Sequence, residues 1–178
     1  LFHYLLDKVR LDASNEWRAY KIVNERFADA IAAELQPGDV VWIHDYQLML
    51  VPRYLRKRVP DARIGFFMHV PWPSSDVFRI LPSRAEILAG LLGADLIGFQ
   101  TENDRQNFLH SAAEVLGLDY GPNSLRWEDR EVQTAVYPIG IDVGTFTRES
   151  PAIEAMTAQL RAETHGKKIL LGVVRLDY

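Results

Sequence analysis

Four side chains that can bind or activate a ligand directly follow short apolar runs of the sequence. His44 and Asp45 come after the first run, His69 after the second and Arg175 after the last. An imidazole can exchange protons with a ligand, a carboxylate accepts hydrogen bonds, and a guanidinium can bind an anion through two parallel hydrogen bonds. If the runs are parallel strands of one sheet, these side chains lie along its carboxyl edge, where open α/β sheets bind ligands. The spacing therefore predicts a ligand site at that edge.

Each of these residues could also have a purely structural role. Asp45 could cap the helix that follows it, because Asp is a preferred N-cap residue. His44 is favoured as a packed core histidine, and Arg175 could lie on the surface or pair with Asp177. His69 precedes an extended Val-Pro-Trp-Pro segment in which no helix needs a cap, so a site role is favoured there. For Asp45 and Arg175, spacing alone does not decide between a site role and a structural one.

The apolar runs predict strands, and the amphipathic segments between them predict helices. The predicted strands cover residues 40–43, 64–68, 95–99, two segments between 124 and 138, and 168–174. The predicted helices cover residues 14–35, 47–58, 75–80, 83–92 and 101–116, with one more that begins at Ser150-Pro151. Apolar strands that alternate with amphipathic helices are typical of an α/β fold, a parallel sheet with helices on both faces. The last helix is expected to lead into a second unit.

Composition and charge argue against several classes of protein. The 178 residues carry 20 basic and 24 acidic side chains, and the net charge of −4 gives no support to a nucleic-acid partner. The sequence has no cysteine, which excludes disulfides and fits a reducing, cytoplasmic location. The longest nearly apolar stretch, 87–99, contains Asp95 and is too short to span a membrane. Because the chain starts with Leu1, we interpret it as an internal piece of a longer protein.

Several familiar site motifs are absent from the sequence. There is no Gly-x-Gly-x-x-Gly loop, no Walker A loop and no Gly-x-Ser-x-Gly nucleophile elbow. No set of His, Asp and Glu has the spacing of metal ligands, so we expect no metal site.

Five motifs, in their order and spacing, resemble those of the trehalose-6-phosphate synthase family. They are VWIHDYQLM at 41–49, IGFFMHVPWP at 64–73, DLIGFQT at 95–101, YPIGID at 137–142 and RLDY at 175–178. The resemblance implies a glycosyltransferase-B fold, in which two Rossmann-like domains face each other across a cleft. It assigns residues 1–148 to the acceptor-side domain, and 149–178 to a linker helix and the first strand of the nucleotide-sugar-binding domain.

The resemblance also implies an activity. The family transfers glucose from a nucleotide-glucose, usually UDP-glucose, to glucose 6-phosphate with retention, and the product is α,α-trehalose 6-phosphate. The implied partners are these two substrates, with no cofactor, nucleic acid or membrane, and a homo-oligomer is compatible with the resemblance. Three further readings stay open: a non-catalytic regulatory subunit, an inactive fragment, and a related retaining glycosyltransferase with another phosphorylated acceptor.

Site roles carry over from the resemblance by position. Asp45 matches the residue that contacts the acceptor sugar, and His69 matches the one that contacts the transferred glucose. Arg175 matches the arginine that reaches the donor diphosphate, and Gly140 matches a backbone turn that lines the cleft. Where the family usually has an acidic residue before that arginine, this sequence has Val174. The implied reaction is a front-face displacement in which the leaving phosphate takes the acceptor's proton.

Overall fold

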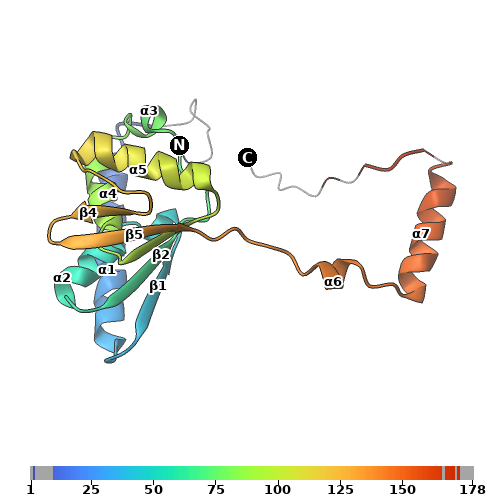
Figure 1. The fold of residues 1–178 in the computed structure, drawn as a ribbon, viewed down its shortest axis with the longest axis horizontal. Helices are drawn as coiled ribbons and strands as arrows, with labels where there is room; N and C mark the ends of the chain where they lie inside the picture. The colour runs from blue at the N-terminus through green and yellow to red at the C-terminus, as the bar shows by residue number, and fades with distance from the viewer. Residues whose placement is uncertain (1, 3–9, 166, 171, 173–178) are drawn as a thin grey trace. The chain divides into compact units, whose positions relative to one another are not determined.

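The computed structural model describes residues 2, 10–165, 167–170 and 172, and the chain divides into two compact units (Figure 1). The first unit is Leu1–Pro138 and the second is Ile139–Tyr178. This division lies close to the domain boundary predicted after residue 148, which stays a prediction.

The first unit is built on a mainly parallel sheet. Its order among the described strands is β1-β2-β3-β5-β4. Strands β1 (Val40–His44), β2 (Arg63–Phe67), β3 (Leu96–Phe99) and β5 (Arg130–Val136) pair in parallel, and β4 (Ser124–Trp127) pairs antiparallel with β5. The predicted strands of this unit are therefore confirmed, and so is the mainly parallel α/β fold class.

One layer of helices covers one face of this sheet. The helices are α1 (Ser14–Glu34), α2 (Val51–Arg58), α3 (Ser75–Phe78), α4 (Arg84–Leu91) and α5 (Glu102–Leu116), with a short 3-10 helix, η2 (Tyr46–Leu48). Along the layer α1 packs on α2, α2 on α4, and α4 on α5. Beneath them a row of buried side chains crosses the sheet in register, formed by Ile43, Phe66, Ile97 and Thr134. Burial of this row and of the facing helix residues stabilises the unit.

None of the described helices of this unit covers the other face of the sheet, which we call the bare face. Val40 and Trp42, which point to that side of β1, are 63% and 67% exposed. Gly98 makes room for an aromatic ring, because a Cβ there would come within 2.7 Å of the Phe67 side chain. A Cβ on Gly65 would be in ordinary contact with Trp42, at 3.7 Å. The expectation of helices on both faces is therefore wrong for the described residues. The first four residues of β1 are apolar, but only the alternate side chains Val41 and Ile43 are covered.

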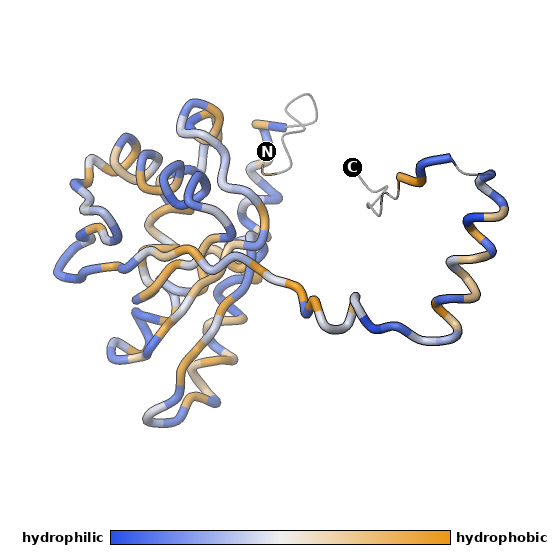
Figure 2. Tube along the Cα trace, turned by 45° about the vertical axis from the view of Figure 1, so that its right-hand side comes forward, coloured by the Kyte–Doolittle hydropathy of each residue, from blue (hydrophilic) through white to orange (hydrophobic). Residues whose placement is uncertain are grey.

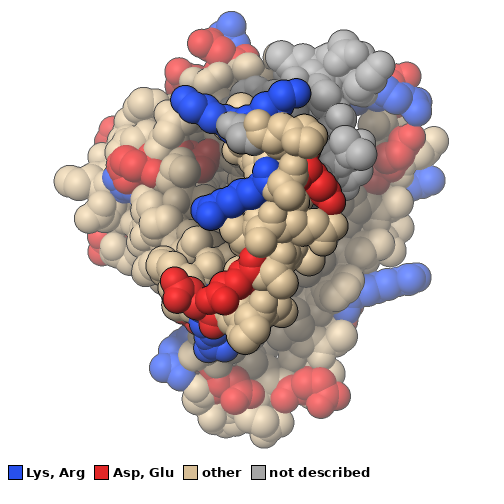
Figure 3. Space-filling model, turned by 90° about the vertical axis from the view of Figure 1, so that its right-hand side faces the viewer, with Lys and Arg blue, Asp and Glu red and all other residues tan. Residues whose placement is uncertain are grey.

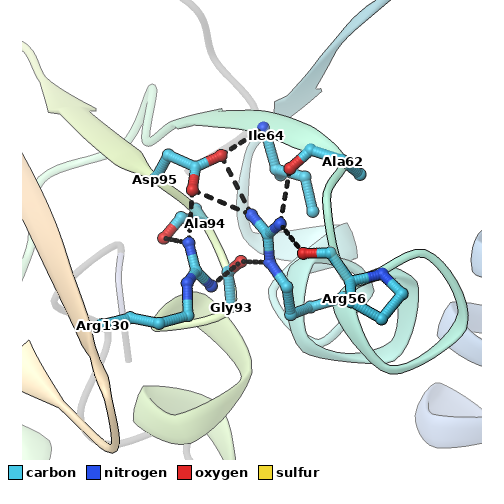
Figure 4. Close-up of polar contacts among 8 residues, drawn as sticks. Arg56, Ala62, Ile64, Gly93, Ala94, Asp95 and Arg130 are labelled. Carbon is cyan, nitrogen blue, oxygen red and sulfur yellow. Dashed lines mark hydrogen bonds and ion pairs between the residues drawn. The ribbon is translucent and has the colours of Figure 1, made fainter. Parts of the chain in front are cut away.

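A charged cluster ties the amino-terminal ends of the strands together (Figure 4). Both oxygens of Asp95 lie 2.9 Å from Nη2 of Arg56, Oδ2 accepts the Ile64 N–H at 2.7 Å, and Oδ1 also pairs with Arg130. The two guanidiniums donate to a shared carbonyl, that of Gly93, at 3.2 and 2.9 Å. Burial and the charge of Arg56 lower the pKa of Arg130. We call Arg56, Asp95 and Arg130 the Asp95 clamp, because they join α2, β2, β3 and β5.

The second unit contains two described helices. Helix α6 (Val143–Phe146) is a single turn capped by Asp142, and α7 (Pro151–Glu163) is capped by the Ser150 hydroxyl, as predicted from Ser150-Pro151. Figure 2 shows apolar and polar residues alternating along α7. The strand predicted over 168–174 is not formed at its described residues, 168–170 and 172. A strand needs a neighbour for its backbone hydrogen bonds, and the described part of this unit offers none.

Candidate functional site

Three of the predicted site residues meet where β1 and β2 end. The parallel register places His44 beside Phe67, so the residues that follow the two strands are neighbours although they are about two dozen positions apart. The N–H of Asp45 donates to the Phe67 carbonyl at 2.8 Å, and Asp45 Oδ1 accepts the N–H of His69 at 3.3 Å. The carboxyl edge thus holds an aspartate and two histidines, as the sequence predicted.

Asp45 has an unusual backbone conformation. Its φ of 69° and ψ of 172° fall in a region that is almost restricted to glycine, because Cβ crowds the backbone there. Such strain persists only where the surrounding structure imposes it, and it is concentrated at functional sites. The side chain makes no capping hydrogen bond to η2, which Asp45 precedes. The helix-cap interpretation of Asp45 is therefore wrong, since its carboxylate turns instead to the backbone of His69.

His44 is not a packed core histidine, because its side chain is exposed on the bare face of the sheet. Its Nδ1 lies 2.8 Å from Nε2 of His69, a hydrogen bond between two imidazoles. Each ring also rests against an aromatic neighbour: the His44 and Trp42 centroids are 4.4 Å apart, and those of His69 and Phe67 are 4.7 Å apart. This pairing was not predicted, because it depends on the strand register.

The segment after His69 is anchored by Trp72. This side chain is fully buried, and its Nε1 donates to Ser111 Oγ at 3.1 Å. The Trp72 N–H donates to Asp104 Oδ1 at 3.0 Å, and its carbonyl accepts from Asn107 at 3.1 Å. All three partners belong to α5, which Thr101 caps as predicted. The extended segment therefore holds His69 at the strand end without a helix of its own.

The turn after Asp45 is held by two polar residues of α1 that the sequence analysis missed. The Tyr20 hydroxyl donates to the Tyr46 carbonyl at 2.7 Å and accepts the Met49 N–H at 3.0 Å. Asn24, fully buried, donates to the Gln47 carbonyl at 3.1 Å. Burial raises the pKa of Tyr20 to about 12. A signal was present: Tyr20 and Asn24 stand four residues apart on the helix face that turns inward.

Two of the predicted site residues are not placed at this edge. Gly140 belongs to the second unit, where its backbone is exposed and a Cβ would meet no atom within 4 Å. Arg175 lies outside the described residues, as do Val174 and Asp177.

The described residues give little support to other kinds of site. None of their groups of His, Asp and Glu is arranged to hold a metal ion. Among the described helices, none combines the length and apolar character needed to cross a membrane. Figure 3 shows Lys and Arg interspersed with Asp and Glu on the face that it draws. What remains is an exposed edge with one carboxylate and two imidazoles, which can hydrogen-bond to the hydroxyl groups of a polar ligand.

Comparison with known proteins gives one consistent result. Residues 1–178 match the model of glycosyltransferase family 20. The chain is 43% identical over 180 residues to the UDP-forming α,α-trehalose-phosphate synthase A of Dictyostelium discoideum, covering 100% of this chain and 24% of that protein. It is 41% identical over 185 residues to the 56 kDa subunit of the UDP-forming synthase of Saccharomyces cerevisiae, and the match covers 100% of this chain and 37% of that protein. The chain therefore spans between about a quarter and two fifths of the length of such relatives.

Solved structures give the same picture. A trehalose-6-phosphate structure from E. coli with UDP-2-fluoro glucose has a TM-score of 0.80 at 38% identity, covering 92% of this chain and 37% of that one. The N-terminal domain of a Candida albicans trehalose-6-phosphate phosphatase has a TM-score of 0.84 at 37% identity, and the match covers 94% of this chain and 36% of that one.

Proposed function

Because the chain belongs to glycosyltransferase family 20 over its whole length, we propose that the full-length protein transfers glucose from UDP-glucose to glucose 6-phosphate and forms α,α-trehalose 6-phosphate. The observation that carries this proposal is the sequence identity of 41% to 43% with UDP-forming synthases across every residue of the chain. The cluster of Asp45, His44 and His69 at the carboxyl edge supports it, since polar groups there suit sugar hydroxyls.

In this proposal each site residue has one task. Asp45 accepts a hydrogen bond from a hydroxyl of the acceptor, and His69 positions a hydroxyl of the transferred glucose. Arg175 stabilises the charge that develops on the leaving diphosphate, and the backbone at Gly140 lines the cleft. The bond between the anomeric carbon and the donor phosphate oxygen breaks as the acceptor oxygen bonds to the same carbon on the same face. The departing phosphate takes the acceptor's proton.

One comparison favours a second candidate function. The fold also matches the N-terminal domain of a protein named as a trehalose-6-phosphate phosphatase, with a TM-score of 0.84. A domain of this family can thus form part of a protein named for the phosphatase reaction. The second candidate is that this chain belongs to such a protein and serves as a non-catalytic, synthase-like domain.

The test is an activity measurement on the full-length protein with UDP-glucose and glucose 6-phosphate. We expect UDP release to match trehalose 6-phosphate formation, and a chelator to leave the rate unchanged, because no metal takes part in the proposed step. The same assay with glycerol 3-phosphate in place of glucose 6-phosphate tests whether the protein uses a different phosphorylated acceptor. A folded protein that makes no product with either acceptor contradicts the proposal and favours the non-catalytic domain.

Variants then test the residue roles. Asp45→Asn removes one charge-assisted hydrogen bond worth about 1.5–3 kcal/mol, so KM for glucose 6-phosphate should rise about tenfold or more while donor binding changes little. His69→Ala should lower kcat with little loss of stability, because its imidazole is exposed. His110→Ala, on the surface of α5, is the matched control. The 178 residues alone are expected to be inactive. A cytoplasmic location and a homo-oligomeric state stay predictions.

A further inference from the structure

His44 has no role in the reaction as proposed so far, yet it touches the residue assigned to the transferred glucose. Its Nδ1 lies 2.8 Å from Nε2 of His69, and the two ring planes are inclined by only 26°. The contact follows from the sheet, because His44 is the last residue of β1 and pairs in register with Phe67, two residues before His69.

Each imidazole of the pair packs against an aromatic neighbour. Trp42, on the same face of β1, packs against His44 with its ring centroid 4.4 Å away. Phe67 packs against His69 with its ring centroid 4.7 Å away, in space that a Cβ on Gly98 would occupy. These packed neighbours restrict the tilt of both imidazoles. The hydrogen bond to His44 then determines which edge of the His69 ring faces outward.

The chemistry of imidazole makes this choice consequential. A neutral ring has one N–H donor and one bare nitrogen that accepts, and the partner of one nitrogen fixes the state of the other. Here Nε2 of His69 is occupied by His44. Among the described residues, Nδ1 of His69 has no hydrogen-bond partner, so it is the ring nitrogen left for a ligand. Without His44, the ring can turn about its Cβ–Cγ bond and present either nitrogen.

We propose that His44 is a positioning residue, which fixes the orientation of the His69 ring and couples its tautomer to that of His44, so that Nδ1 meets the hydroxyl of the transferred glucose. This inference rests on the proposed function for the identity of its ligand. The contact between the two rings does not depend on that function. Removal of the group that orients a metal-binding histidine through its second nitrogen typically costs about 10–100-fold in metal affinity or activity, and we expect an effect near the lower end of that range here.

The kinetic test uses two variants and a control in the full-length protein. His44→Leu removes the partner of His69 Nε2, and kcat should fall about tenfold or more, while KM for glucose 6-phosphate stays within about twofold. His44→Asn places a polar side-chain atom close to the position of Nδ1, so it should recover most of kcat. His110→Leu makes the same change on α5 away from the pair, and should behave as wild type.

A spectroscopic measurement separates this inference from the proposed function. In protein labelled with nitrogen-15 histidine, His44→Leu should change the chemical shift of His69 Nε2, because the variant removes the hydrogen-bond partner of that nitrogen. This change is expected whether or not the protein makes trehalose 6-phosphate. Unchanged His69 signals in His44→Leu overturn the inference, and so does His44→Asn as impaired as His44→Leu. Loss of folding in His44→Leu also overturns it, because His44 is then structural.

Discussion

The backbone strain at Asp45 can be measured by comparing two substitutions of the same residue. Glycine has no Cβ, so it adopts the observed φ of 69° and ψ of 172° without the crowding that Asp and Ala both suffer. Asp45→Gly and Asp45→Ala both remove the carboxylate and its 3.3 Å hydrogen bond from the His69 N–H. The difference in free energy of unfolding between the two variants therefore reports the strain, reduced by the extra flexibility that glycine gives the unfolded chain.

The size of this difference follows from two opposing terms. A residue held in this region of backbone conformation costs about 1–3 kcal/mol, which glycine recovers. Glycine also makes the unfolded chain more flexible than alanine does, which costs about 0.4–1 kcal/mol. The net expectation is that Asp45→Gly is more stable than Asp45→Ala by about 1 kcal/mol. Loss of the hydrogen bond, about 1 kcal/mol, is common to both variants.

The assay is urea denaturation followed by circular dichroism, with the midpoint and slope compared for both variants. Asp39 is the control position, because its backbone is not among the positive-φ residues. There the order should reverse, with Asp39→Ala more stable than Asp39→Gly by about 0.4–1 kcal/mol. If Asp45→Ala is at least as stable as Asp45→Gly, the residue is not strained and the argument for a functional site loses its backbone evidence.

Three further predictions concern the stability of the first unit. Asp95→Ala should cost about 2 kcal/mol in urea denaturation, because it leaves the two arginines of the Asp95 clamp without their shared anion; a loss below about 0.5 kcal/mol would mean that the clamp is only a surface pairing. Gly93→Ala should cost about 2 kcal/mol or more, because its Cβ would lie 2.3 Å from the backbone nitrogen of Arg53. Gly121→Ala, whose Cβ would have its nearest neighbour at 3.8 Å, should change stability by less than about 0.5 kcal/mol, and equal costs would refute the packing argument. Tyr20 keeps its proton up to about pH 12 in the folded protein but releases it near pH 10 when unfolded, so stability should fall between these values by about 3 kcal/mol. Tyr20→Phe should remove this fall in urea midpoints, and an unchanged pH dependence would show that another group is responsible.

Local signals in the sequence were enough to predict most elements of the first unit. The helix predicted to start at Thr101 does so because the hydroxyl of Thr101 accepts the N–H of Asp104, an interaction that spans three residues. The short apolar runs became strands, and their ends carried His44, Asp45 and His69 to one edge. That placement depends only on the parallel direction of β1 and β2, which the alternation of strands and helices predicts.

The remaining features depend on register or on a second layer, which local patterns do not encode. Trp42 and Ile43 are both apolar, but the pleat sends them to opposite faces, and only one face is covered in the described unit. The hydrogen bond between His44 and His69 requires the register of two strands. Nothing in the sequence predicts the strained backbone at Asp45, because the residue there is not the glycine that usually marks such a conformation.

The order of strands in the sheet bears on how the chain folds during synthesis. The first three strands, β1, β2 and β3, stand side by side in the order in which they leave the ribosome. Strand β2 can pair with β1 once both have emerged, and β3 can then pair with β2. Strand β4 cannot follow this pattern, because the next neighbour of β3 is β5. Strand β4 can join the sheet only through β5, and Arg130, the first residue of β5, reaches Asp95 only when β5 pairs with β3. Until that step the nascent protein has an unpaired edge at β3, where a stalled chain can pair with another chain.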